Sequence, residues 1–321
     1  MMPSAAIDML GVAAAIEAAR DTGLLRALAT RNGTPHEYAC ELHLDRGAVA
    51  RVLDVLATAN VAVRKAGRYT AAPELSSFAA MPGGVEEQLE LWRHVTDFLR
   101  TGEPLARMDA AAPEREASYR CVVAGLGEIF TAPARQLASR LDRAPRHILD
   151  VGCGSGVWSL AIAERCTNTR VTGLDLPAAL TAFAARAEVL GLGDRIELLP
   201  GDMHVVDLAI NRFDLAVIAN VLRLEPQEHA ARLISRVAAA LRPGGELVIV
   251  DALAQGTPER ERSRAVYALH LALRTTSGRV HPAEEIAAWL RHAGLNDIRV
   301  VELDSYAGAV GALLARVRTS T

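Results

Sequence analysis

From residue 147 onward the chain alternates short apolar runs with amphipathic segments, and this alternation limits the folds open to it. The runs "HILDVG", "RVTGLDL", "RIELLPGD", "FDLAVIANVL" and "ELVIVDAL" are typical of buried strands, and helical patterns separate them. Strands that alternate with helices form a mostly parallel sheet with helices on both faces. The sequence therefore predicts a doubly wound α/β domain, in which ligands bind outside the carboxyl ends of the strands.

The first 80 residues follow a different, mainly helical pattern. Residues 34–42 predict a helix capped by Thr34, residues 46–59 a second amphipathic helix, and residues 61–73 a hairpin, which together make a winged helix. Winged helices usually bind DNA, but residues 1–80 carry eight Arg or Lys and eight Asp or Glu. A DNA-binding surface needs an excess of positive charge, so we expect no nucleic-acid partner. The apolar opening segment predicts instead a helix buried in a homodimer.

Length and composition set the remaining limits. The chain has 321 residues, half of them apolar, and a net charge of −3, which fits two globular domains. We assign residues 1–100 to a winged-helix dimerisation domain and 101–321 to a helical linker plus the ligand-binding α/β domain. Neither a membrane span nor a secretory signal is visible, and the four cysteines lack metal-type spacing, so we expect a cytoplasmic protein with reduced thiols.

The segment "ILDVGCGSG" (148–156) is a strand that runs into a glycine-rich turn and then a helix. The glycines allow a tight turn and close approach of the backbone to a ligand. Asp175 ends the next strand, where a carboxylate can accept both ribose hydroxyls. Asp202 and Met203 follow the third strand, where they suit an adenine amino group and an adenine ring. The glycine spacing differs from that of dinucleotide-binding folds.

These features resemble the Rossmann-like S-adenosylmethionine-dependent methyltransferases. The order of winged helix, helical linker, glycine turn, "FDLAVIANVL" and "LRPGGELVIVDA" is similar to the plant and bacterial O-methyltransferase family, whose members are typically dimers. The resemblance implies S-adenosylmethionine as cofactor, bound by Gly152, Gly154, Gly156, Asp175, Leu176, Asp202, Met203 and Asn220.

Two positions depart from this family pattern. The family's usual general base is a histidine after "NVL", and this chain has Arg223 there, which cannot accept a proton in the physiological range. The second departure is His281, which we place at the cap of a helix beginning near Pro282, although histidine is a poor cap. His229 lies in the first turn of the preceding helix. Both histidines are expected near strand ends, where one metal ion could join them.

A small bacterial branch of the family methylates the β-carbon of 2-oxo acids on an iron or zinc ion held by two histidines. Resemblance to it implies His229 and His281 as metal ligands, Trp92 and Arg120 around the substrate, and catalytic roles for Arg223, His229 and His281. The favoured hypothesis is therefore metal-dependent C-methylation of a small-molecule 2-oxo acid. The alternatives are a metal-free O- or N-methyltransferase of a small aromatic natural product, and a non-catalytic winged-helix regulator.

Overall fold

The computed structural model describes residues 4–73, 75, 84–109, 127, 129–253, 256–303 and 309–318. It divides the chain into two compact units, Met1–Glu90 and Leu91–Thr321. The two units divide within helix α6 (Gly84–Arg93), and helix α7 (Val95–Thr101) follows in the second unit; the domain boundary that we expect between residues 100 and 101 stays a prediction. Among the described residues, no helix is long and apolar enough to cross a membrane.

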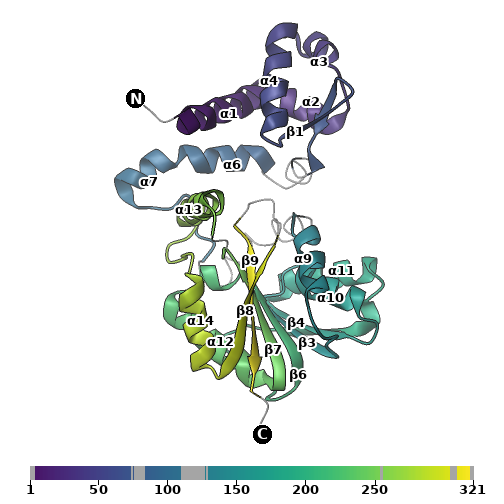
Figure 1. The fold of residues 1–321 in the computed structure, drawn as a ribbon, viewed down its shortest axis with the longest axis vertical. Coiled ribbons are helices and arrows are strands. Elements are labelled where there is room, and N and C mark those ends of the chain that lie inside the picture. Colours follow the sequence, from purple (N-terminus) through teal and green to yellow (C-terminus); the bar gives the residue numbers. More distant parts are fainter. Residues whose placement is uncertain are drawn as a thin grey trace. The chain divides into compact units, whose positions relative to one another are not determined.

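The first unit contains the expected winged helix (Figure 1). Helices α1 (Ser4–Asp21) and α2 (Leu24–Thr30) precede α3 (Pro35–Leu42) and α4 (Arg46–Thr58), and strands β1 (Ala62–Lys65) and β2 (Arg68–Ala71) form the hairpin. Thr34 and Glu37 make a reciprocal capping box at the start of α3. The hairpin turns at Ala66 and Gly67, which both have positive φ, as a tight two-residue turn requires.

The second unit holds a seven-stranded sheet in the order β5-β4-β3-β6-β7-β9-β8. Its strands are β3 (His147–Val151), β4 (Arg170–Asp175), β5 (Ile196–Pro200), β6 (Phe213–Ala219), β7 (Leu241–Asp251), β8 (Leu295–Glu302) and β9 (Gly311–Val317). Strands β3 to β7 pair in parallel, whereas β9 is antiparallel to both β7 and β8. The prediction of a doubly wound α/β domain is thus confirmed.

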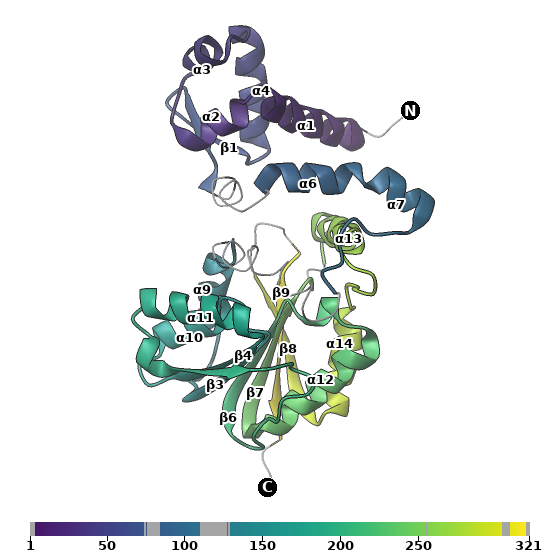
Figure 2. The same ribbon diagram turned by 180° about the vertical axis from the view of Figure 1, so that it is seen from behind.

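Helices cover both faces of this sheet (Figures 1 and 2). One apolar core lies under α9 (Thr131–Ser139), α10 (Val157–Arg165) and α11 (Pro177–Val189). The other lies under α12 (Gln227–Ala240) and α14 (Ala283–His292), and α13 (Pro258–Ala272) follows β7. Strand β3 leads through α10 to β4 on one side and pairs with β6 on the other, so the strand order reverses at β3 and β6. A ligand crevice is expected at this point.

Candidate active site

The glycine-rich turn after β3 has a backbone that only glycine adopts easily. Gly152, Gly154 and Gly156 all have positive φ, between 53° and 69°. A Cβ atom on Gly156 would lie 2.2 Å from Cδ2 of Phe183, because α10 begins directly against α11. Gly156 is the N-cap residue of α10, so the amide groups of that helix's first turn lie near the carboxyl end of β3, where a ligand crevice is expected.

Asp175 stands at the carboxyl end of β4 and holds this turn in place. Its Oδ2 accepts a hydrogen bond of 2.8 Å from the amide of Gly154, and its Oδ1 accepts one of 2.7 Å from the amide of Leu176. The side chain is only half-buried and lies at the carboxyl end of β4, beside the glycine turn. The geometry therefore fits a carboxylate that fixes the glycine turn and still receives ribose hydroxyls.

Asp202 and Met203 follow β5, at the same edge of the sheet. Oδ1 of Asp202 accepts a 2.8 Å hydrogen bond from the amide of His204, and Met203 packs against the core beneath α12. Asn220 follows β6 with a positive φ of 60°, and its Oδ1 accepts a hydrogen bond from Arg223. The predicted cofactor residues thus lie at the carboxyl ends of β3, β4, β5 and β6, and their contacts with bound cofactor remain predictions.

Asp150 lies beneath the turn within β3 and accepts a hydrogen bond from the Ser159 hydroxyl. Burial raises the pKa of Asp150 to about 7, against the lowering effect of that hydrogen bond. Because Asp150 is buried and hydrogen-bonded to α10 through Ser159, this carboxyl supports the turn from inside the protein.

Arg223 lies in a short 3-10 helix, Leu222–Leu224, and is buried. Its Nη1 donates a 2.8 Å hydrogen bond to Oδ1 of Asn220 and lies 3.5 Å from Oδ1 of Asp251. The guanidinium also lies over the Tyr267 ring, 5.1 Å from its centre. The position of the family's general base therefore carries a fixed positive charge, balanced by a carboxylate that the sequence analysis did not identify.

His270, which the sequence analysis also missed, belongs to the same cluster on α13. Burial lowers its pKa to about 3, and the charges of Arg274 and Arg223 lower it further in the same direction. Nη2 of Arg274 lies 3.0 Å from Nδ1 of His270. Because a guanidinium only donates, Nδ1 acts as acceptor and the ring proton is on Nε2. His270 is thus a neutral hydrogen-bond donor beside Arg223.

Trp92 stacks on this histidine, with ring centres 5.5 Å apart, and is 37 % exposed. The predicted substrate residue Trp92 therefore lies next to the cluster of Arg223 and His270. Arg120, the other predicted substrate residue, lies outside the described residues.

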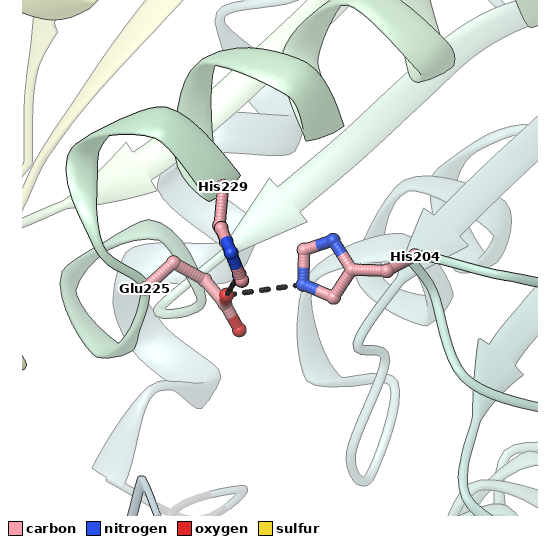
Figure 3. A group of neighbouring side chains, drawn as sticks. All are labelled: His204, Glu225 and His229. Carbon is pink, nitrogen blue, oxygen red and sulfur yellow. Dashed lines mark ion pairs between the residues drawn. The ribbon is translucent and has the colours of Figure 1, made fainter.

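The structure places the two predicted metal ligands in different surroundings. Nδ1 of His229 lies 3.6 Å from Oε2 of Glu225, and Nε2 of His204 lies 3.0 Å from the same oxygen (Figure 3). His281 is 3 % exposed, and its Nε2 lies within hydrogen-bond distance of the carbonyl oxygens of Leu222 and Glu225. His204 and Glu225, rather than His281, are the side-chain neighbours of His229.

The helix cap that we assigned to His281 is wrong. Helix α14 begins at Ala283, and Pro282 is its N-terminal cap residue in an extended conformation. His281 precedes the cap, and its ring ties the segment before α14 to the 3-10 turn that carries Arg223. This contact accounts for a histidine at this place without a metal ion.

The comparisons with known proteins agree with this architecture. Residues 148–245 match a family model described as a methyltransferase domain. The chain is 25 % identical to the 3-hydroxy-5-methyl-1-naphthoate 3-O-methyltransferase of Streptomyces sahachiroi, over 90 % of this chain and 88 % of that protein. It is 27 % identical to a demethylspheroidene O-methyltransferase of Cereibacter sphaeroides, over 86 % of this chain and 74 % of that protein.

Two solved structures share the fold. A mitomycin 7-O-methyltransferase superposes with a TM-score of 0.67 at 22 % identity, covering 97 % of this chain and 95 % of its own. Human N-acetylserotonin methyltransferase, solved with S-adenosylmethionine, gives a TM-score of 0.69 at 18 % identity, covering 99 % of this chain and all of its own. With the glycine turn and the sheet order, the family match shows a Rossmann-like methyltransferase domain over residues 148–245, and the chain as a whole is similar to the bacterial O-methyltransferases named above.

Proposed function

We propose that the chain transfers the methyl group of S-adenosylmethionine to an acidic hydroxyl of a small aromatic molecule in natural-product biosynthesis. The observation that carries the proposal is the buried Arg223 at the position of the family's base, held by Asn220 and Asp251. The curated relatives named above act on oxygen, which favours oxygen over carbon as the acceptor. This proposal departs from the sequence-based preference for C-methylation.

The residues of the cluster limit how the acceptor can be activated. Arg223 cannot accept a proton, and Nδ1 of His270 is already an acceptor for Arg274. Both side chains instead offer N–H groups, and Arg223 adds a positive charge, which together stabilise an oxygen anion in a buried site. The acceptor would therefore react as a phenolate that is ionised before or during binding. Trp92 would pack against its aromatic ring.

The cofactor supplies an activated methyl group on a sulfonium ion, and the chain's residues bind and orient it. The glycine turn allows close approach, Asp175 would hold the ribose, and Asp202 with Met203 would hold the adenine. The enzyme's remaining contribution is positioning, so that the phenolate oxygen and the methyl carbon meet in line.

The test is product analysis with S-adenosylmethionine labelled with carbon-13 on its methyl group. The purified chain is incubated with substituted phenols and, separately, with 2-oxo acids, and carbon NMR then distinguishes a methyl group on oxygen from one on carbon. Methyl ethers from acidic phenols support the proposal. Methyl transfer only to the β-carbon of 2-oxo acids would overturn it.

That second outcome is the other candidate function, metal-dependent C-methylation of a 2-oxo acid. The same cluster favours it to a degree, because an enolate is also an anion that Arg223 and His270 would stabilise. The sequence-based version places an iron or zinc ion, as a Lewis acid, between His229 and His281. An ion there would require His281 to leave the carbonyl oxygens of Leu222 and Glu225.

We also propose that the chain is a homodimer joined through its first unit. Helix α1 leaves Ile7, Met9 and Leu10 at least half exposed, which is costly for a lone helix and typical of a surface that a partner covers. Light scattering tests this, with a dimer expected for the full chain and a shift to monomer for Leu10→Asp. A monomeric full chain would contradict it.

A chain that binds the cofactor but methylates none of the acceptors would point to the non-catalytic regulator.

A further inference from the structure

His204, Glu225 and His229 bring three potential metal-ligand atoms together at the edge of the sheet beside α12. The two nitrogen atoms and one carboxylate oxygen all lie within 4.8 Å of one another (Figure 3). We propose that this cluster, which we call the His-Glu-His site, binds one divalent transition-metal ion of the zinc type. The proposal does not depend on which acceptor the enzyme methylates.

The spacing of the ligand atoms suits such an ion. Two donors bound to zinc at about 2.1 Å in tetrahedral geometry lie about 3.4 Å apart. The observed separations from Oε2 of Glu225 are 3.0 Å to Nε2 of His204 and 3.6 Å to Nδ1 of His229. The two nitrogen atoms lie within 4.8 Å of each other, so an ion at this place requires side-chain rotations that bring this separation near the tetrahedral value.

The backbone already holds two of these residues in place. The amide of His204 donates to Oδ1 of Asp202, and the amide of Glu225 donates to the carbonyl of Leu222 at 3.0 Å. Glu225 and His229 are four residues apart, and Glu225 immediately precedes Pro226, the cap residue of α12. The Glu225 carboxylate thus lies beside the first turn of α12, with its Oε2 3.6 Å from Nδ1 of His229.

The charge of Glu225 calls for a cation. Its side chain is 7 % exposed, and within the described part of the chain its ion-pair partners are the two imidazoles. Two neutral imidazoles would leave a buried carboxylate without a compensating charge, which is costly. The buried Nε2 of His204 also lacks a hydrogen-bond partner of ordinary geometry, although the carboxylate oxygen is near. A role as a metal ligand, which uses the lone pair of the nitrogen, would account for the absence of such a partner at Nε2 of His204.

The donor set indicates the kind of ion. Two imidazoles and one carboxylate suit zinc and neighbouring transition metals, whereas calcium and magnesium prefer oxygen ligands alone. His229 is 48 % exposed on its side chain, so water can complete the coordination from the solvent side. The positive end of the α12 dipole disfavours a cation at this place, and the Glu225 carboxylate offsets that effect.

The site would connect two segments that are far apart in the sequence. His204 directly follows Asp202 and Met203, the predicted adenine contacts, whereas Glu225 and His229 belong to the start of α12. Such an ion would fix the loop after β5 against that helix. We therefore expect its removal to lower the thermal stability of the chain and to loosen the loop that carries Asp202.

Metal titration of the full chain tests the proposal directly. The protein is dialysed against a chelator and titrated with zinc by calorimetry and with cobalt(II) by visible absorption. We expect one ion per chain, with a cobalt spectrum typical of nitrogen and oxygen ligands. His204→Ala and His229→Ala should each weaken binding at least about tenfold, since even residues that only support metal ligands cost 10–100-fold.

Glu228→Gln is the matched control, because Glu228 is exposed on the same helical turn and lies outside the His-Glu-His site. It should bind zinc like the unmodified chain, and circular dichroism should show that every variant is folded. Absence of zinc binding by the unmodified chain, or full binding by the two histidine variants, would overturn the proposal. Neither measurement involves methyl transfer, so failure of the proposed function would leave this result unaffected.

Discussion

Replacement of Asp175 by alanine should weaken cofactor binding in a way that the structure allows us to estimate. The carboxylate accepts hydrogen bonds from the amides of Gly154 and Leu176 and is expected to accept the ribose hydroxyls as well. Loss of hydrogen bonds to a charged group costs about 1–3 kcal/mol, which corresponds to roughly 5–150-fold in the dissociation constant. The loss of the Gly154 tether would add to the effect, because the turn must then be ordered by the cofactor itself.

The assay is calorimetric titration of S-adenosylhomocysteine into Asp175→Ala, into Asp194→Ala and into the unmodified chain. Asp194 is an exposed acidic residue of the same unit, outside the predicted cofactor site, so its removal controls for a change of net charge. Urea unfolding shows whether the variants are folded. Unchanged affinity of a folded Asp175→Ala protein would refute the assignment of the ribose site.

We make two further predictions for the glycine turn and the residues beneath it. Gly156→Ala should lower the free energy of unfolding by about 2–5 kcal/mol, because the position has a positive φ and an added Cβ would overlap Phe183. Gly191→Ala is the control: Gly191 has a similar φ but open space around it, so this variant should lose only about 1–2 kcal/mol in urea unfolding. Equal losses in the two variants would contradict the overlap with Phe183. Burial raises the pKa of Asp150 to about 7, so the folded chain retains a proton that the unfolded chain loses near pH 4. The contribution of Asp150 to the stability of the fold therefore falls as the pH rises from about 4 to about 7. The stability of Asp150→Asn relative to the unmodified chain should therefore rise by about 3 kcal/mol between pH 5 and pH 8, and a constant difference would contradict the assigned burial.

Features set by local sequence were predicted well. The helix cap at Thr34, the hairpin within residues 61–73 and the glycine turn at 152–156 each follow from a few adjacent residues whose conformational preferences agree. The doubly wound sheet follows from alternation over a longer stretch. We placed the cap of α14 one residue too early, at His281, whereas the extended Pro282 is the cap residue. The sequence pattern alone does not distinguish the cap residue from the residue before it.

Contacts between distant segments were not predictable from spacing. His204 and Glu225 are 21 positions apart and meet only because β5 and β6 bring their following loops to one edge of the sheet. The partners of Arg223 are similarly dispersed, since Asp251 ends β7 and Tyr267 lies on α13. The departure of Arg223 from the family pattern was visible in the sequence, but the donor cluster around it required the structure.

The measurement that tests the central claim most directly is the pH dependence of methyl transfer across a series of phenols of graded acidity. With Arg223 at the base position and His270 locked as a donor, the rate should rise with the ionisation of each phenol, and the midpoint should move with the acceptor's own pKa. Arg223→His, which restores a titratable base, should instead give one midpoint shared by all acceptors. A single midpoint shared by all phenols in the unmodified enzyme would reveal a protein base and contradict the claim.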